Sequence, residues 1–101
     1  MKDGAARKVV HIVDDDEPVR TSLCALLSAH RYDAVASASA EEFLEVFTPA
    51  RTSCAVIDLR LPGMNGIELQ KLLVSRGVKT PLILLTAHGD VPAAVEAMKA
   101  G

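Results

Sequence analysis

Four short apolar runs divide the chain, and each leads into a longer segment with helical spacing. The runs are Val9–Val13, Asp33–Ser37, Cys54–Asp58 and Leu82–Thr86. Runs of this length that are rich in Val, Ile and Leu predict β-strands. Because residues 54–58 are almost continuously apolar, the third strand is predicted to be buried on both faces.

Apolar residues in the intervening segments recur every three or four positions, which predicts helices. Pro18 suits the first turn of the first helix. Ser39 and Glu42 have capping-box spacing at the start of the second. Asn65 and Asp90 are suitable caps for the third and fourth. The predicted helices run from Pro18 to about His30, from Ser39 to about Phe47, from Asn65 to Gly77 and from Val91 to Lys99.

Strands that alternate with helices through short loops predict a parallel sheet with right-handed crossovers. A chain of 101 residues suits one small domain, so we expect residues 1–101 to form a single α/β unit of four βα repeats.

Composition narrows the function without identifying it. The chain is 50% hydrophobic but only 3% aromatic, and its net charge of −2 gives no electrostatic case for binding nucleic acid. The longest apolar runs are too short to span a membrane, and residues 1–8 lack an apolar leader, so a cytoplasmic location is expected. Cys24 and Cys54 are predicted to be reduced core thiols.

Oxygen-bearing side chains follow three of the four strands. Asp14 and Asp15 follow the first, Asp58 ends the third and Thr86 ends the fourth. Because the carboxyl ends of parallel strands share one edge of the sheet, these groups are predicted to meet. Clustered carboxylates repel unless a cation neutralises them, and oxygen ligands suit Mg²⁺. A carboxylate beside Mg²⁺ is equipped to accept a phosphoryl group, and Asp58 is the candidate.

Each of these features also has an ordinary explanation. The acidic run from Asp14 to Asp16 is common at a helix N-terminus, and Asp58 before Pro62 is a typical turn residue. Thr86 is a β-branched residue at the end of a strand. Their occurrence together at successive strand ends favours the functional interpretation.

Three segments carry a resemblance to a known family. Val13–Arg20, Asp58–Gly66 and Leu85–Asp90 resemble the receiver domain of bacterial two-component response regulators. The D-D, D-x-x-x-P-x-x-x-G and hydrophobic-T motifs occur in the family's order and spacing. The sequence that begins at Thr86 looks most like that of the FixJ-like subgroup. The resemblance covers essentially all of the chain after residue 8.

The resemblance implies a doubly wound, flavodoxin-like sheet and a signalling module rather than an enzyme. Asp58 would be phosphorylated. Asp15 and Asp58 would bind Mg²⁺ directly, and Asp14 mainly through water. The remaining implied site groups are the backbone carbonyl of Arg60 as a metal ligand, and Thr86 and Ala87 as switch or phosphate contacts.

The resemblance also implies partners. A sensor histidine kinase would donate the phosphoryl group, and DNA would be bound only by an output domain outside this sequence. The family has a fifth strand that ends in a Lys and a fifth helix, and this sequence is expected to lack both elements and the Lys. We therefore expect an exposed edge at the fourth strand, an apolar surface beside it, and homodimerisation or other self-association.

Two other functions stay open on the sequence alone. One is a haloacid-dehalogenase-like phosphatase that uses Asp14 and Asp16, because D-x-D follows a strand and Leu84–Thr86 resembles that family's second motif. The other is an interaction module that is never phosphorylated.

Overall fold

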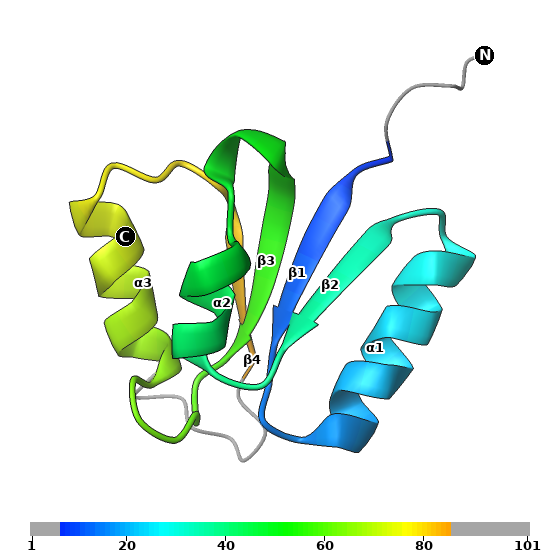
Figure 1. Ribbon diagram of the computed structural model, residues 1–101, viewed down its shortest axis with the longest axis horizontal. Coiled ribbons are helices and arrows are strands. Elements are labelled where there is room, and N and C mark those ends of the chain that lie inside the picture. Colours follow the sequence, from blue (N-terminus) through cyan, green and yellow to red (C-terminus); the bar gives the residue numbers. More distant parts are fainter. Residues whose placement is uncertain (1–6, 86–101) are drawn as a thin grey trace.

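The computed structural model describes residues 7–85, which form a four-stranded parallel sheet with helices packed against it (Figure 1). The order of strands across the sheet is β2-β1-β3-β4. This arrangement confirms the predicted α/β fold. The strands are β1 (Val9–Val13), β2 (Asp33–Ser37), β3 (Thr52–Asp58) and β4 (Leu82–Leu85). The helices are α1 (Glu17–Ala29), α2 (Ala40–Val46) and α3 (Gly66–Ser75), with a short 3-10 helix, η1 (Pro49–Arg51), between α2 and β3.

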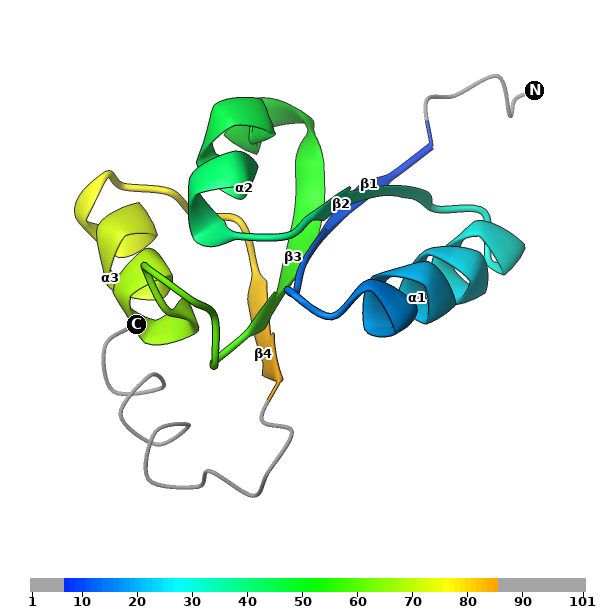
Figure 2. The ribbon, with the colours of Figure 1, turned by 60° about the horizontal axis from the view of Figure 1, so that its bottom comes forward.

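The helices lie on both faces of the sheet (Figure 2). α2 and α3 cover one face, and α1 covers the part of the other face formed by β2 and β1. The main core lies under α2 and α3, where large side chains are fully buried. These include Val13, Phe43, Ile57, Leu69 and Leu73. The predicted helix over 91–99 lies outside the described residues.

Side-chain caps explain why the helices begin where they do. The carboxylate of Asp16 accepts a hydrogen bond from the Val19 N–H at 3.3 Å. Ser39 caps α2 through the Glu42 N–H at 3.1 Å. Asn65 and Glu68 form a reciprocal capping box at the start of α3. The predicted starts of the first three helices are therefore confirmed to within about a residue.

Burial of β3 on both faces was a wrong prediction. Ala55 and Ile57 are fully buried under α2 and α3, but Val56 and Cys54 on the opposite face are only half-buried. The reason is that α1 packs on β2 and β1 and does not extend over β3 and β4. Ile83, which pairs with Val56, is 50% exposed.

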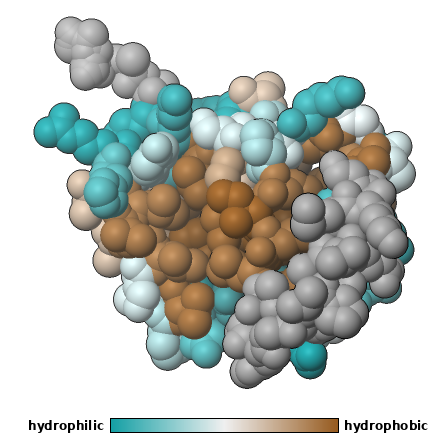
Figure 3. All heavy atoms as spheres, turned by 180° about the vertical axis from the view of Figure 1, so that it is seen from behind, coloured by the Kyte–Doolittle hydropathy of each residue, from teal (hydrophilic) through white to brown (hydrophobic). Residues whose placement is uncertain are grey.

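This poorly covered side of the sheet forms a broad apolar surface (Figure 3). The residues of β3 and β4 on this surface are Cys54, Val56, Ile83 and Leu85. Cys24 on α1 is also half-buried. Both cysteines are free thiols, as predicted, but neither lies in the core. Within residues 7–85, no helix combines the length and the apolar character that crossing a membrane requires.

Candidate functional site

The end of β1 holds Asp14 in a fixed position. Its backbone N–H donates to the carbonyl of Ser37 at 3.1 Å, which continues the pairing with β2. Its carbonyl accepts from Nη1 of Arg20 on α1 at 2.9 Å. The side-chain Oδ1 accepts from the Asp16 N–H, also at 2.9 Å. Both the backbone and the carboxylate of this buried residue are therefore oriented.

Asp58 ends β3, and the loop that follows is folded back against it. The carbonyl of Leu59 accepts from the Gly66 N–H at 3.1 Å. A Cβ on Gly66 would meet the carbonyl oxygen of Asp58 and would lie 2.8 Å from Cα of Leu59, so only glycine fits here. The Arg60 N–H donates to Oδ1 of Asp58 at 3.0 Å. These contacts hold the carboxylate at the edge of the sheet.

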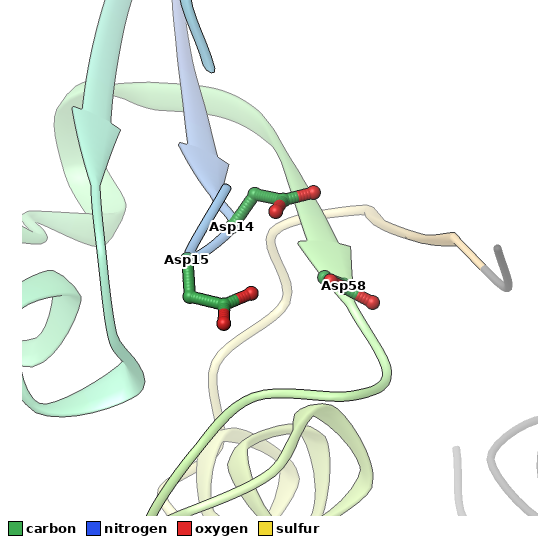
Figure 4. Close-up of side chains that lie close together, drawn as sticks. All are labelled: Asp14, Asp15 and Asp58. Atoms are coloured by element: carbon green, nitrogen blue, oxygen red, sulfur yellow. The ribbon is translucent and has the colours of Figure 1, made fainter. Parts of the chain in front are cut away.

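Three carboxylates meet at this edge (Figure 4). One oxygen from each of Asp14, Asp15 and Asp58 lies within 4.8 Å of the others. Asp14 is buried, Asp58 is half-buried and Asp15 is exposed. Asp14 and Asp15 come from the end of β1 and Asp58 from the adjacent β3, as the predicted parallel topology requires.

The surroundings of Asp14 disfavour its charged form. Burial raises the pKa of Asp14, and the hydrogen bond from the Asp16 N–H partly opposes this shift. The neighbouring charges of Asp58, Asp15 and Asp16 raise the pKa of Asp14 further. A cation at the cluster would reverse the effect of these charges.

The residues present fit a hard cation such as Mg²⁺. The donors are carboxylate oxygens, which such ions prefer, and neither cysteine belongs to the cluster. An open hollow beside Asp15, lined also by Arg60, Pro62 and Asn65, leaves room for water or a substrate oxygen. Few protein ligands together with water are typical of Mg²⁺ sites.

The structure brings together most of the predicted site that it describes. Asp14, Asp15 and Asp58 converge, and Arg60 lies in the same hollow. The metal-ligand role of the Arg60 carbonyl stays a prediction. Thr86 and Ala87 lie outside the described residues. Asp16 is not a member of the cluster, because its carboxylate caps α1.

Several supporting contacts were not predicted from the sequence. Arg20 ends the Val13–Arg20 segment, but nothing in that segment shows that its guanidinium reaches the backbone of Asp14. The proximity of Glu41 to the loop after Asp58 was also missed. Of these supporting residues, only Gly66 could have been singled out from the sequence, because it is the glycine of the D-x-x-x-P-x-x-x-G motif.

Comparison with known sequences supports the interpretation of the site. A family model described as the response regulator receiver domain matches residues 10–101. The chain is 47% identical over 92 residues to the transcriptional regulatory protein FixJ of Azorhizobium caulinodans, and 49% identical over 92 residues to FixJ of Rhizobium meliloti. Each match covers 91% of this chain but only 44% and 45% of the relative. The chain thus spans about half the length of these curated relatives.

Solved structures agree with the sequence matches. The crystal structure of FixJ-N superimposes with a TM-score of 0.84 at 48% identity, covering 95% of this chain and 77% of that one. The response regulator StyR gives a TM-score of 0.86 at 44% identity, covering 95% of this chain and 48% of that one. The convergent aspartates, the fold and these similarities lead to one conclusion: this chain belongs to the response regulator receiver domain family, with FixJ-like relatives.

Proposed function

We propose that Asp58 accepts a phosphoryl group from a sensor histidine kinase in a Mg²⁺-dependent reaction. The observation that carries this proposal is the convergence of Asp14, Asp15 and Asp58 within 4.8 Å at the carboxyl edge of the sheet. Three carboxylates this close repel one another unless a cation neutralises them. A carboxylate beside such a cation can accept a phosphoryl group from a donor.

In the proposed reaction, one set of groups binds Mg²⁺ and another orients the Asp58 carboxylate. Asp14, Asp15, Asp58 and the Arg60 carbonyl would hold Mg²⁺, which supplies charge neutralisation for the phosphoryl oxygens when bound. The Arg60 N–H orients the Asp58 carboxylate through Oδ1. We assign the nucleophilic role to Oδ2. Its bond to phosphorus forms as the P–N bond of the kinase phosphohistidine breaks, and the imidazole nitrogen keeps the electron pair.

The output of the phosphorylated domain is proposed from its relatives. The FixJ relatives are named transcriptional regulatory proteins, and this chain spans less than half of their length. We infer that phosphorylation controls a transcriptional output domain, with Thr86 and Ala87 contacting the phosphoryl group. The cytoplasmic location and self-association stay predictions, the latter supported by the exposed apolar surface of β3 and β4.

Labelling by acetyl phosphate tests the proposal directly. We expect Mg²⁺-dependent, hydroxylamine-sensitive incorporation of one phosphoryl group into the wild type and none into Asp58→Asn. Asp33→Asn is the matched control. Asp33 is exposed and starts β2, so it lies at the amino-terminal ends of the strands, away from the aspartate cluster. Undiminished labelling of Asp58→Asn would refute the assignment, and an unlabelled wild type would favour the interaction module without phosphorylation.

The phosphatase alternative is less well supported than the phosphoacceptor. Its second aspartate, Asp16, is used as the cap of α1 and lies outside the carboxylate cluster. Steady turnover of a phosphomonoester that is lost in Asp14→Asn and kept in Asp58→Asn would support it instead.

A further inference from the structure

Glu41 reaches from the first turn of α2 to the loop that follows Asp58. Its Oε2 accepts a hydrogen bond at 3.2 Å from the backbone N–H of Met64, twenty-three residues later in the chain. A Cβ on Gly63 would lie 3.1 Å from the same oxygen. Gly63 has a φ of +71°, so the carboxylate rests against a turn that already favours glycine. The Glu41 carboxylate thus lies against Gly63 and Met64 of this loop.

The same loop is anchored at its beginning by the sheet. The Leu59 N–H donates to the carbonyl of Leu85 at 3.0 Å, and its carbonyl accepts from Gly66 at 3.1 Å. The side chains of Leu59 and Leu61 are buried. Arg60, whose carbonyl is the proposed metal ligand, lies between this anchor and the bond from Met64 to Glu41.

Glu41 is itself held in place by the packing of α2. Phe43, two residues later, is fully buried in the core, and Ser39 caps the helix two residues earlier. The backbone of Glu41 is therefore held relative to the core, and the bond from the Met64 N–H connects its carboxylate to the loop. Its side chain is exposed, so the support does not come from burial of Glu41 itself.

We propose that Glu41 is a positioning residue for cation binding. It holds the Pro62–Met64 turn so that the Arg60 carbonyl and the Asp58 carboxylate are presented together to Mg²⁺. This inference rests on the proposed function, because it assumes that the aspartate cluster binds the cation. Glu41 touches neither the cation nor the phosphoryl donor in this account.

The test compares Glu41→Ala and Glu41→Gln with Glu45→Ala, an exposed glutamate later on the same helix. Three quantities are measured on the whole chain: amide hydrogen exchange at Met64, the Mg²⁺ dissociation constant by NMR titration, and the rate of acetyl phosphate labelling against Mg²⁺ concentration. The first needs neither cation nor phosphoryl donor.

In Glu41→Ala we expect faster exchange at Met64 and Mg²⁺ affinity weaker by roughly 2- to 10-fold, the range that one hydrogen bond to a partly exposed group supplies. The labelling rate at saturating Mg²⁺ should remain close to wild type, since only the presentation of ligands is impaired. Glu41→Gln keeps an acceptor oxygen and should recover most of both effects. Glu45→Ala should match the wild type.

Wild-type Met64 exchange and Mg²⁺ affinity in Glu41→Ala would overturn the proposal. So would a loss of maximal labelling rate with unchanged Mg²⁺ affinity, which indicates a different role. A failure of the proposed function can be told apart from a failure of this inference. If Asp58→Asn were still labelled, Asp58 would not be the phosphoryl acceptor. The exchange and Mg²⁺ measurements would still decide the role of Glu41.

Discussion

At the scale of single residues, the folded protein disfavours the charged form of Asp14. It is buried, and burial together with Asp58, Asp15 and Asp16 raises its pKa. Replacement by Asn removes a charge while keeping the Oδ1 acceptor for the Asp16 N–H. We therefore expect Asp14→Asn to raise the free energy of unfolding without Mg²⁺ by roughly 1–2 kcal/mol at neutral pH. Urea denaturation measures this change.

Addition of Mg²⁺ provides the complementary measurement. Because the cation binds only the folded cluster, it should stabilise the wild type by about 2.7 kcal/mol at a concentration one hundred times its dissociation constant. The same Mg²⁺ concentration should stabilise Asp14→Asn less. Asp33→Asn, which changes an exposed carboxylate at the far edge of the sheet, should respond to Mg²⁺ as the wild type does. Equal stabilisation of all three proteins would place the cation elsewhere.

Gly66 offers a steric test at the same scale. The added methyl of Gly66→Ala would collide with the backbone of Asp58 and Leu59, which cannot rotate away as a flexible side chain would. We expect a loss of roughly 2–4 kcal/mol in the free energy of unfolding, together with weaker Mg²⁺ binding. Gly77→Ala is the control. Its Cβ meets open space, so only its φ of +74° opposes it, at about 1 kcal/mol. Equal losses would contradict the close approach.

At the scale of elements, β1 and α2 are joined by an aromatic contact that the sequence did not reveal. His11 is buried in β1, and its ring lies edge-on to Phe43 and Phe47 at 5.2 and 5.6 Å. Within the described residues its Nδ1 has no hydrogen-bond partner. Burial lowers the pKa of His11, so the fold favours the neutral ring.

Stability should therefore depend on pH through His11. Since its pKa is lower in the fold than in the unfolded chain, the unfolded chain binds the proton first. The contribution of neutral His11 to the free energy of unfolding is fully present above about pH 6.5. This contribution is lost as the pH falls toward the pKa of His11 in the folded protein. The slope from this one group reaches at most about 1.4 kcal/mol per pH unit. Urea denaturation at a series of pH values from about 7.5 down to about 5, a range that includes the usual pKa of histidine, measures this dependence.

The contribution of His11 is obtained by difference, because carboxylates also titrate in acid. His11→Leu should lose the steep part of the dependence, whereas His30→Ala, at the exposed end of α1, should retain it. A parallel pH profile for wild type and His11→Leu would show that the buried ring does not control acid stability.

Element boundaries were predicted well where a local signal exists. β1 and β2 match the predicted ranges, and Ser39 and Asn65 cap α2 and α3 through their own side chains. Contacts between distant residues were not predictable in this way. The bond from Met64 to Glu41 depends on how the loop after β3 meets α2, and neither residue is unusual in its own segment.

At the scale of the whole molecule, the apolar surface over β3 and β4 agrees with the apolar surface expected beside the fourth strand, and it departs from the predicted burial of β3 on both faces. Its members Val56 and Ile83 are neighbours across the two strands, and Ile83 is half exposed. The predicted self-association would use this surface, because burial of apolar area favours contact and β4 is the edge of the described sheet.

A charge at this surface tests the predicted self-association. Ile83→Glu should shift sedimentation equilibrium toward the monomer and should change the free energy of unfolding by less than about 1.5 kcal/mol, since the side chain is already half in water. Val46→Glu on α2 is the matched control, with 53% exposure on the other side of the sheet. A wild type that is monomeric at all concentrations, or equal effects of both variants, would refute association through β3 and β4.

The parallel topology explains why the meeting of the three aspartates was predictable while the energetics of the cluster were not. Residues at the ends of adjacent parallel strands must share one edge, so Asp14, Asp15 and Asp58 could be placed together from the pattern alone. The burial of Asp14 and the closeness of Gly66 to Asp58 depend on how loops and helices pack around that edge. Local sequence carries little information on such packing.

The most direct test of the central claim is to locate the phosphoryl group. After acetyl phosphate and Mg²⁺ treatment, borohydride reduces an aspartyl phosphate to homoserine, and peptide mass spectrometry identifies the converted residue. We expect homoserine at position 58 and unchanged Asp14, Asp15 and Asp16. Conversion at Asp14 with an intact Asp58 would contradict it.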